Sequence, residues 1–210
     1  MGVGERRERE RQARKGAVLE AARQVLLEKG FRGTTTKEVA QRCELSEATL
    51  FFYFKNKDEI LVSLLFESIG FWADGLEKLK KSRLSKDKLL DKIWEFHEEV
   101  NDKHPEYYAV SAYLAQSGAL VGVSEDVKEE IVHLSGENFQ RLADLLEQVT
   151  GHDDGHHLAD TLWSTFLGLM VLRDFRINLG HEEVRTTKRD RAAVFETLKQ
   201  GLLASGGSFS

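Results

Sequence analysis

Apolar residues recur at every third or fourth position along most of this 210-residue chain. This is the spacing of helices that bury one face. The first regular stretch covers residues 17–29 and stops at Gly30, a residue type that commonly follows a helix. No long segment alternates between apolar and polar residues, as a half-buried strand would. The pattern therefore predicts an all-α fold.

Two short helices are predicted next, over residues 35–43 and 46–54. Thr35 would cap the first, with Glu38 three residues later as in a capping box. Ser46 would cap the second. Two short helices joined by a tight turn form a helix-turn-helix, whose second helix lies in the major groove of DNA.

The rest of the chain is predicted to form longer helices, about nine helices in all. These longer helices are predicted to begin at Asp58, Ser85, Pro105, Ser124, Leu158 and Arg189. Asp58 is expected to be a capping residue, and residues 206–210 are expected to be a frayed tail. The segment after Leu158 is apolar nearly all round, so we expect it to be buried on more than one side.

Composition agrees with this picture. A single proline fits long helices with short connections, and a single cysteine excludes an intramolecular disulfide. No run of about 18 apolar residues occurs, so we expect neither a signal peptide nor a membrane span. We therefore expect a cytoplasmic protein. Cys43 is expected to act as a small buried hydrophobe.

Charge is distributed unevenly along the chain. Residues 1–57 contain 13 Lys and Arg against 8 Asp and Glu, a formal charge of +5. The whole chain carries −5, so residues 58–210 carry −10. A basic first quarter indicates contact with a polyanion. The charged arm from Arg6 to Lys15 is either a solvated extension or a further DNA contact.

The segment 30–61, GFRGTTTKEVAQRCELSEATLFFYFKNKDEIL, resembles the TetR family of transcriptional regulators. It has the family's order of features: G-F-x-x-T-T, then V-A, L-S at the turn, T-L, and Y-F-x-x-K. The resemblance implies a DNA-binding domain with a charged arm over 1–57. It implies a variable ligand-binding and dimerisation domain over 58–210, with a homodimer formed through the last two helices.

The resemblance also implies the DNA contacts. They are Thr36, Lys37, Glu47, Ala48, Thr49, Phe52, Tyr53 and Lys57. The first two would meet the DNA backbone or an adjacent base edge. The next four would lie on the exposed side of the recognition helix. Tyr53 and Lys57 would bind phosphates, whereas Leu50 and Phe54 would face the core.

Two departures from the family pattern affect recognition. Glu44 stands where the turn usually has glycine, and a non-glycine residue in a left-handed turn costs on the order of 1 kcal/mol. Phe51 stands where tyrosine is usual, so a hydroxyl is missing. We expect Glu47 to accept from a cytosine amine and Phe52 to press on a thymine methyl group. Readout should then depend mainly on apolar contact and DNA shape.

The longer helices are rich in large aromatic residues, which would suit an effector pocket. The candidate lining residues are Trp72, Trp94, His97, Tyr108, Tyr113, Trp163, Phe166, Met170 and Arg173. They predict a small, largely apolar effector. Packing of the core accounts for the same residues nearly as well.

These features favour a homodimeric repressor that leaves a palindromic operator when an effector binds. We expect no catalysis, cofactor, metal or membrane contact. Two alternatives stay open. One is a metal-dependent helical-bundle enzyme, for which the loop 151–157 offers histidine and aspartate side chains. The other is an adaptor that uses the helix-turn-helix for protein contact.

Overall fold

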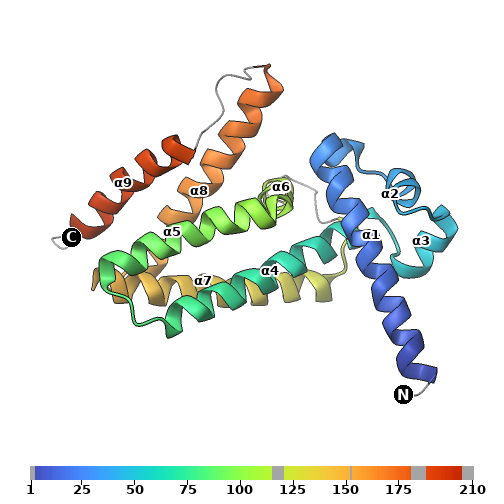
Figure 1. Cartoon of the computed structure of the whole chain (residues 1–210), viewed down its shortest axis with the longest axis horizontal. Coiled ribbons are helices and arrows are strands. Elements are labelled where there is room, and N and C mark those ends of the chain that lie inside the picture. Colours follow the sequence, from blue (N-terminus) through green and yellow to red (C-terminus); the bar gives the residue numbers. More distant parts are fainter. Residues whose placement is uncertain (1–2, 115–120, 152, 181–187, 205–210) are drawn as a thin grey trace. The chain divides into compact units, whose positions relative to one another are not determined.

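The computed structural model describes residues 3–114, 121–151, 153–180 and 188–204. Within these ranges the chain forms nine α-helices and no strand, so the all-α prediction is confirmed (Figure 1). The helices are α1 Val3–Gly33, α2 Thr36–Arg42, α3 Glu47–Tyr53, α4 Lys57–Lys81, α5 Lys86–Lys103, α6 Pro105–Leu114, α7 Glu125–Thr150, α8 Gly155–Asn178 and α9 Lys188–Ala204. The predicted tail at 206–210 lies outside the described residues.

The chain divides into two compact units. The first unit comprises Met1–Ser68 with Pro105–Lys128, and the second comprises Ile69–His104 with Glu129–Ser210. Helix α4 therefore contributes residues to both units. The functional boundary placed between residues 57 and 58 stays a prediction.

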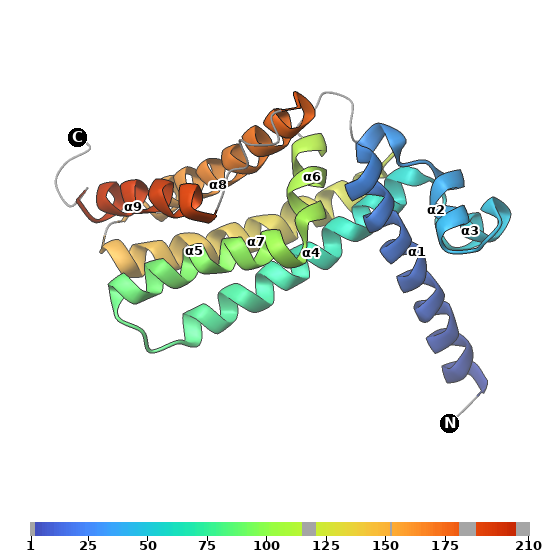
Figure 2. The ribbon, with the colours of Figure 1, turned by 45° about the horizontal axis from the view of Figure 1, so that its top comes forward.

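In the first unit, α2 and α3 lie beside the C-terminal half of α1 (Figure 2). The buried side chains there include Val18, Ala21, Ala22, Val25, Leu26, Val39, Ala40, Leu50 and Phe54. Burial of Leu50 and Phe54 confirms their predicted core positions. Cys43 is half-buried rather than fully buried, because its thiol lies at the end of α2 and donates to the Val39 carbonyl oxygen.

Side-chain caps start the short helices as expected. The Thr35 hydroxyl oxygen accepts from the Glu38 amide at 3.1 Å, and the Ser46 hydroxyl oxygen accepts from the Thr49 amide at 3.1 Å. The prediction that Asp58 caps α4 is wrong. The Asn56 side-chain oxygen accepts from the Glu59 amide at 2.8 Å, so the cap lies two residues earlier and α4 begins at Lys57.

The turn between α2 and α3 has the predicted left-handed residue. Glu44 has φ of 56°, and its amide donates to the Gln41 carbonyl oxygen. The Leu45 amide donates to the Ala40 carbonyl oxygen at 2.9 Å. These two bonds form a Schellman motif, which usually places glycine where Glu44 stands.

The charged arm is helical from Val3, and its residues 4–14 are exposed. It joins the helix of residues 17–29, and α1 loses regular helical geometry at Gly30, where φ is 67°. The arm therefore forms a solvated helical extension. Its contact with DNA stays a prediction.

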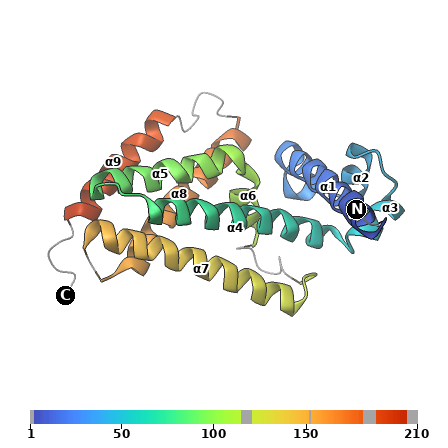
Figure 3. The same ribbon diagram turned by 60° about the horizontal axis from the view of Figure 1, so that its bottom comes forward.

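In the second unit, α4 and α7 run side by side (Figure 3). The Asn138 amide of α7 donates to the Ile69 carbonyl oxygen of α4 at 2.9 Å. Helix α8 begins at Gly155, three residues before the predicted start at Leu158. The Gly155 amide donates to a Glu147 carboxylate oxygen at 3.1 Å, so a contact with α7 fixes this helix start.

Candidate nucleic-acid interface and effector region

Helix α3 exposes nearly all of its surface. Of its seven residues, Leu50 is buried, Tyr53 is half-buried and the other five are exposed. Phe52 is 75% exposed and Phe51 is 47% exposed, which is unusual for phenylalanine. Thr49 is exposed as well. Exposed aromatic residues on a capped helix indicate a surface that binds a partner.

The starts of α2 and α3 are joined by a side-chain hydrogen bond. The Thr36 hydroxyl donates to a Glu47 carboxylate oxygen at 2.9 Å. The hydroxyl oxygens of Ser46 and Thr49 lie 2.8 Å apart and share a second hydrogen bond. The Glu47 carboxylate is therefore held in one direction, and the Thr49 hydroxyl already has a partner.

Lys57 is the first residue of α4 and lies against the end of α1. Its ammonium is 4.4 Å from the centroid of the Phe31 ring and 3.5 Å from the Phe31 carbonyl oxygen. Tyr53 contacts Phe52 edge to face, with ring centroids 5.4 Å apart. The predicted DNA contacts therefore all belong to the first unit, at α2, α3 or the start of α4.

Ion pairs occupy part of the positive charge near α3. Arg42 binds both carboxylate oxygens of Glu28, at 2.8 and 2.5 Å, and this pairing lowers the pKa of Glu28. Lys29 pairs with Glu38. Lys37 and Lys55 are exposed and form no ion pair with another described residue. Lys55 was not among the predicted DNA contacts; it follows the C-cap of α3, Phe54.

The predicted effector residues are divided between the two units. Tyr108 and Tyr113 lie in the first unit, where Tyr113 stacks on Phe31, and the other seven lie in the second. In the second unit His97 is the centre of an aromatic cluster. Its ring centroid is 4.7 Å from that of Trp72 and 5.4 Å from that of Phe166.

The interior of this aromatic cluster is tightly packed. Trp72, Trp94, His97, Phe166 and Met170 are each no more than 3% exposed. The His97 Nδ1 atom lies 2.8 Å from the Ile93 carbonyl oxygen. Burial lowers the pKa of His97 to about 4, so the imidazole is neutral at pH 7.

At the edge of the cluster, Trp163 and Arg173 are half-buried. The Trp163 ring contacts Trp72 edge to face, with centroids 5.8 Å apart. Arg173 donates to Asn101.

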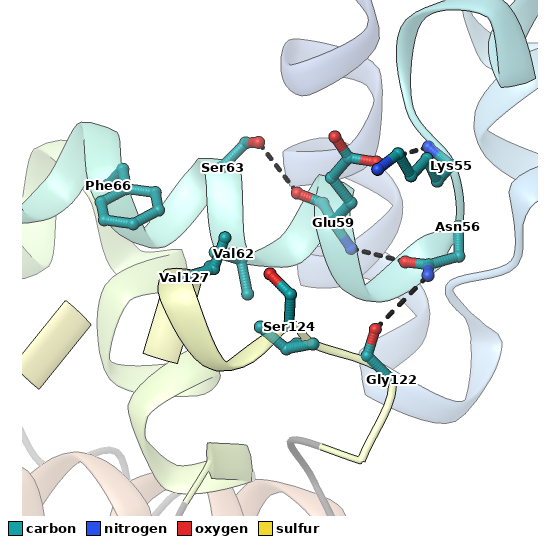
Figure 4. A pocket seen from close by; sticks show the side chains of 10 residues that line it. Lys55, Asn56, Glu59, Val62, Ser63, Phe66, Gly122, Ser124 and Val127 are labelled. Atoms are coloured by element: carbon teal, nitrogen blue, oxygen red, sulfur yellow. Dashed lines mark hydrogen bonds between the residues drawn. The ribbon is translucent and has the colours of Figure 1, made fainter. Parts of the chain in front are cut away.

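Cavities occur elsewhere in both units. In the first unit, a cavity of about 310 Å³ lies between the start of α4 and the start of α7 (Figure 4). Val62, Phe66 and Val127 form its apolar side. The polar groups at its rim form hydrogen bonds with one another: the Asn56 side chain accepts from the Glu59 amide and donates to the Gly122 carbonyl oxygen. None of the nine predicted effector residues lines this cavity.

A family profile of "Bacterial regulatory proteins, tetR family" matches residues 18–64, which hold the exposed α3 and its two supporting helices. Over 48 residues the chain is 52% identical to the HTH-type transcriptional regulator YvkB of Bacillus subtilis. Residues 18–64 thus match the TetR family.

Another curated relative is the fatty acid metabolism regulator protein of Bacillus subtilis. It is 32% identical over 73 residues, which cover 34% of this chain and 38% of that protein. The match to YvkB covers 23% of this chain and 25% of that protein. The alignments thus span well under half the length of these two relatives.

Solved structures extend the likeness to the whole fold. The fatty acid degradation regulator FadR of Bacillus halodurans superimposes with a TM-score of 0.68 at 19% identity, covering 93% of this chain and 96% of that one. FadR of Bacillus subtilis, solved in complex with stearoyl-CoA, gives 0.66 at 18% identity and covers 91% and 98%. At these identities the likeness establishes the TetR fold alone.

The structure also bears on metal binding and on membrane contact. No group of three or more His, Cys, Asp or Glu side chains among the described residues could hold a metal ion. His152, in the loop considered for metal binding, lies outside the described residues. The described helices include none with the length and apolar character needed to cross a membrane.

Proposed function

We propose that this protein is a homodimeric TetR-family repressor that binds a roughly palindromic DNA operator through α3. The observation that carries the proposal is the exposure of Phe51, Phe52 and their neighbours on a short helix that only Leu50 anchors to the core. A recognition helix needs this arrangement, because one face must hold the fold while the opposite face enters the groove.

The proposed contacts divide by chemistry. Lys37, Tyr53 and Lys57 would bind the DNA backbone and set the register, while residues of α3 would meet base edges. Thr36, whose hydroxyl donates to Glu47, would orient that carboxylate at the edge of the interface. Two copies of α3 would occupy successive major grooves, about 34–36 Å apart. Lys57 suits a phosphate because its ammonium is held at the start of α4 by the ring and carbonyl oxygen of Phe31.

We place the dimer interface on α8 and α9. Exposed apolar side chains on the C-terminal half of α8 and its C-cap are Val171, Leu172, Phe175, Ile177 and Leu179. An apolar cavity of about 630 Å³ lies between α8 and α9, lined by Leu158, Leu198 and Leu202 among others. Apolar surface of this extent on a soluble chain supports a protein interface.

The effector is proposed to be a small, largely apolar molecule bound in the second unit. The aromatic cluster around His97 is apolar but tightly packed, so an effector bound among these side chains would have to move them apart. Two relatives bear on the class of molecule: one is named a fatty acid metabolism regulator, and one was solved with stearoyl-CoA. A molecule with an acyl chain is therefore the first candidate to test.

Release of the protein from its operator would result from a shift in population between a DNA-binding and a non-binding conformation. Helix α4 belongs to both units, so an effector in the second unit can bias the position of the recognition helix that precedes α4. Couplings of this kind are typically about 1–3 kcal/mol. The effector must prefer the non-binding conformation by that amount. The protein would act in the cytoplasm, without catalysis and without a cofactor.

Salt-dependent DNA binding tests the proposal. Operators would be selected from random duplexes with the purified full-length protein, and affinity measured by fluorescence anisotropy across a salt series. We expect a steep negative slope of affinity with salt. Lys57→Ala should reduce that slope by about 1, and the dimer should persist in size-exclusion chromatography.

Val132→Ala is the matched control, because Val132 is 72% exposed on α7 and has no proposed role. It should leave both affinity and slope unchanged. Tyr53→Ala should weaken operator binding to a degree comparable with Lys57→Ala. Absence of salt-dependent binding to any duplex would refute the repressor and favour an adaptor that contacts protein.

A further inference from the structure

The recognition helix lacks every side chain that makes bidentate bonds to purines. Residues 47–53 read EATLFFY, with no Arg, Lys, Asn or Gln. In the major groove, Arg and Lys pair with guanine, and Asn and Gln pair with adenine. Helix α3 therefore cannot read a purine in the way that most recognition helices do.

What α3 offers instead is an apolar surface. Phe52 and Phe51 are 75% and 47% exposed, and both follow the exposed Ala48 by three or four residues. Residues three and four apart share one helix face. The apolar group that a base edge presents in the major groove is the C5-methyl group of thymine. Two phenyl rings and a methyl side chain complement such a group.

The hydrogen-bonding groups of α3 complement the same class of base. The Glu47 carboxylate can only accept, and the Thr36 hydroxyl fixes its direction from 2.9 Å away. A carboxylate accepts from the N4 amine of cytosine. The Thr49 hydroxyl is bonded to Ser46, so it adds little purine readout.

We propose that α3 reads the major-groove edges of pyrimidines. Phe51 and Phe52 would contact C5-methyl groups, and Glu47 would accept from a neighbouring cytosine amine. Thr36 is then a positioning residue, since it acts through Glu47. The proposal rests on the proposed function and adds the class of operator. In these half-sites the C5-methyl group of the pyrimidine, rather than the identity of the paired purine, would decide the affinity of the protein for DNA.

A consequence follows for modified DNA. 5-Methylcytosine presents both a C5-methyl group and an N4 amine, so it should replace thymine at a methyl-contact position. At that position, thymine and 5-methylcytosine should give equal affinity. Uracil and cytosine should also give equal affinity, but a weaker one. A helix that read the partner purine would instead group thymine with uracil, because both pair with adenine.

The experiment uses wild-type protein and synthetic duplexes, so no variant has to fold. Duplexes selected from a random pool would be remade with uracil in place of each thymine in turn. We expect about fourfold weaker binding for each methyl group removed from contact, the factor that corresponds to the burial of one CH₂ group. Replacing the same thymine by 5-methylcytosine opposite guanine should restore the affinity.

Variants then assign the residues. In Phe52→Ala the ratio of thymine to uracil affinity should fall to about one at the position that Phe52 contacts, while Val132→Ala should keep the wild-type ratio. Thr36→Val should relax the preference for cytosine at the neighbouring position and leave the thymine-to-uracil ratio unchanged. Thr36→Ser retains the hydroxyl and should restore the cytosine preference.

The outcomes separate the two proposals. Salt-dependent binding with equal affinity for thymine and uracil at every position would overturn pyrimidine readout and leave the repressor intact. A Thr36→Val protein with an unchanged cytosine preference would remove the positioning role. Failure to select or bind any duplex would refute the proposed function, and pyrimidine readout with it.

Discussion

Arg23 lies on α1 and is surrounded by three carboxylates. Its Nε atom is 2.8 Å from a Glu106 oxygen on α6, and one terminal nitrogen is 2.6 Å from a Glu67 oxygen on α4. Glu20, one turn earlier on α1, is the third partner. Glu106 is completely buried, and the Arg23 side chain is 19% exposed. This cluster joins three helices of the first unit through one guanidinium.

Replacement of Arg23 by methionine keeps the apolar stem and removes the charge. Glu106 would remain buried without its arginine, and removal of one partner of a buried ion pair costs about 3–5 kcal/mol. Glu67 is 42% exposed, so loss of its contact adds little. Glu106→Gln should cost only about 1 kcal/mol, because the amide oxygen still accepts from Arg23 and the arginine keeps two carboxylates.

The assay is urea unfolding followed by circular dichroism at constant protein concentration. The decisive result is the order of the losses in unfolding free energy: Arg23→Met should lose much more than Glu106→Gln. Arg23→Met combined with Glu106→Met should recover most of the loss, since apolar replacement of a buried pair is often neutral. Arg42→Met is the control, because its pair with Glu28 is on the surface. Equal losses for Arg23→Met and Arg42→Met would refute the reasoning.

Three further predictions concern single sites. Glu44→Gly should raise the unfolding free energy by about 0.5–1 kcal/mol, because Glu44 has φ of 56°. Gly70→Ala should stabilise by about 1 kcal/mol, whereas Gly75→Ala on the same helix should destabilise, because its added carbon would lie 2.0 Å from the Phe96 ring. Burial holds the pKa of His97 at about 4, so the unfolded chain binds a proton from pH 6.5 downward that the folded protein does not bind. Stability should therefore fall by about 3 kcal/mol from pH 6.5 to 4, and His97→Gln should lose that component.

Each of these predictions has a contrary result. A Glu44→Gly protein no more stable in urea than wild type would show that the left-handed turn carries no strain. Stabilisation by Gly75→Ala equal to that by Gly70→Ala would mean that Phe96 moves freely. An unchanged pH slope in His97→Gln would assign the acid sensitivity to other groups.

Local signals in the sequence predicted local structure well. The caps at Thr35 and Ser46 were predictable because each involves an amide three residues away. The cap of α4 was not, because Asn56 and Asp58 are both good capping residues and the sequence does not choose between them. The start of α8 at Gly155 depends on a carboxylate from α7, which a local pattern cannot reveal.

The candidate sites also contain features that the local sequence predicts and features that depend on contacts between helices. The exposed face of α3 follows from helix geometry, since Leu50 and Phe54 take the core side. The bond between Thr36 and Glu47 could not be predicted, because it depends on how α2 crosses α3. The effector residues were the least predictable, since an aromatic side chain at helix spacing suits a packed core and a pocket alike.

Folding and recognition are separated within the seven residues of α3. Leu50 and the adjoining Phe54 are at most 3% exposed, and the Ser46 cap satisfies the first turn, so these groups hold the helix in place. Phe51 and Phe52 have most of their contact surface outside the fold, so they contribute little to its stability. Truncation of a buried leucine costs about 2–5 kcal/mol, whereas surface substitutions usually change stability by less than about 0.5 kcal/mol. If α3 reads bases as proposed, substitutions at Phe51 and Phe52 should therefore change base preference without loss of the fold.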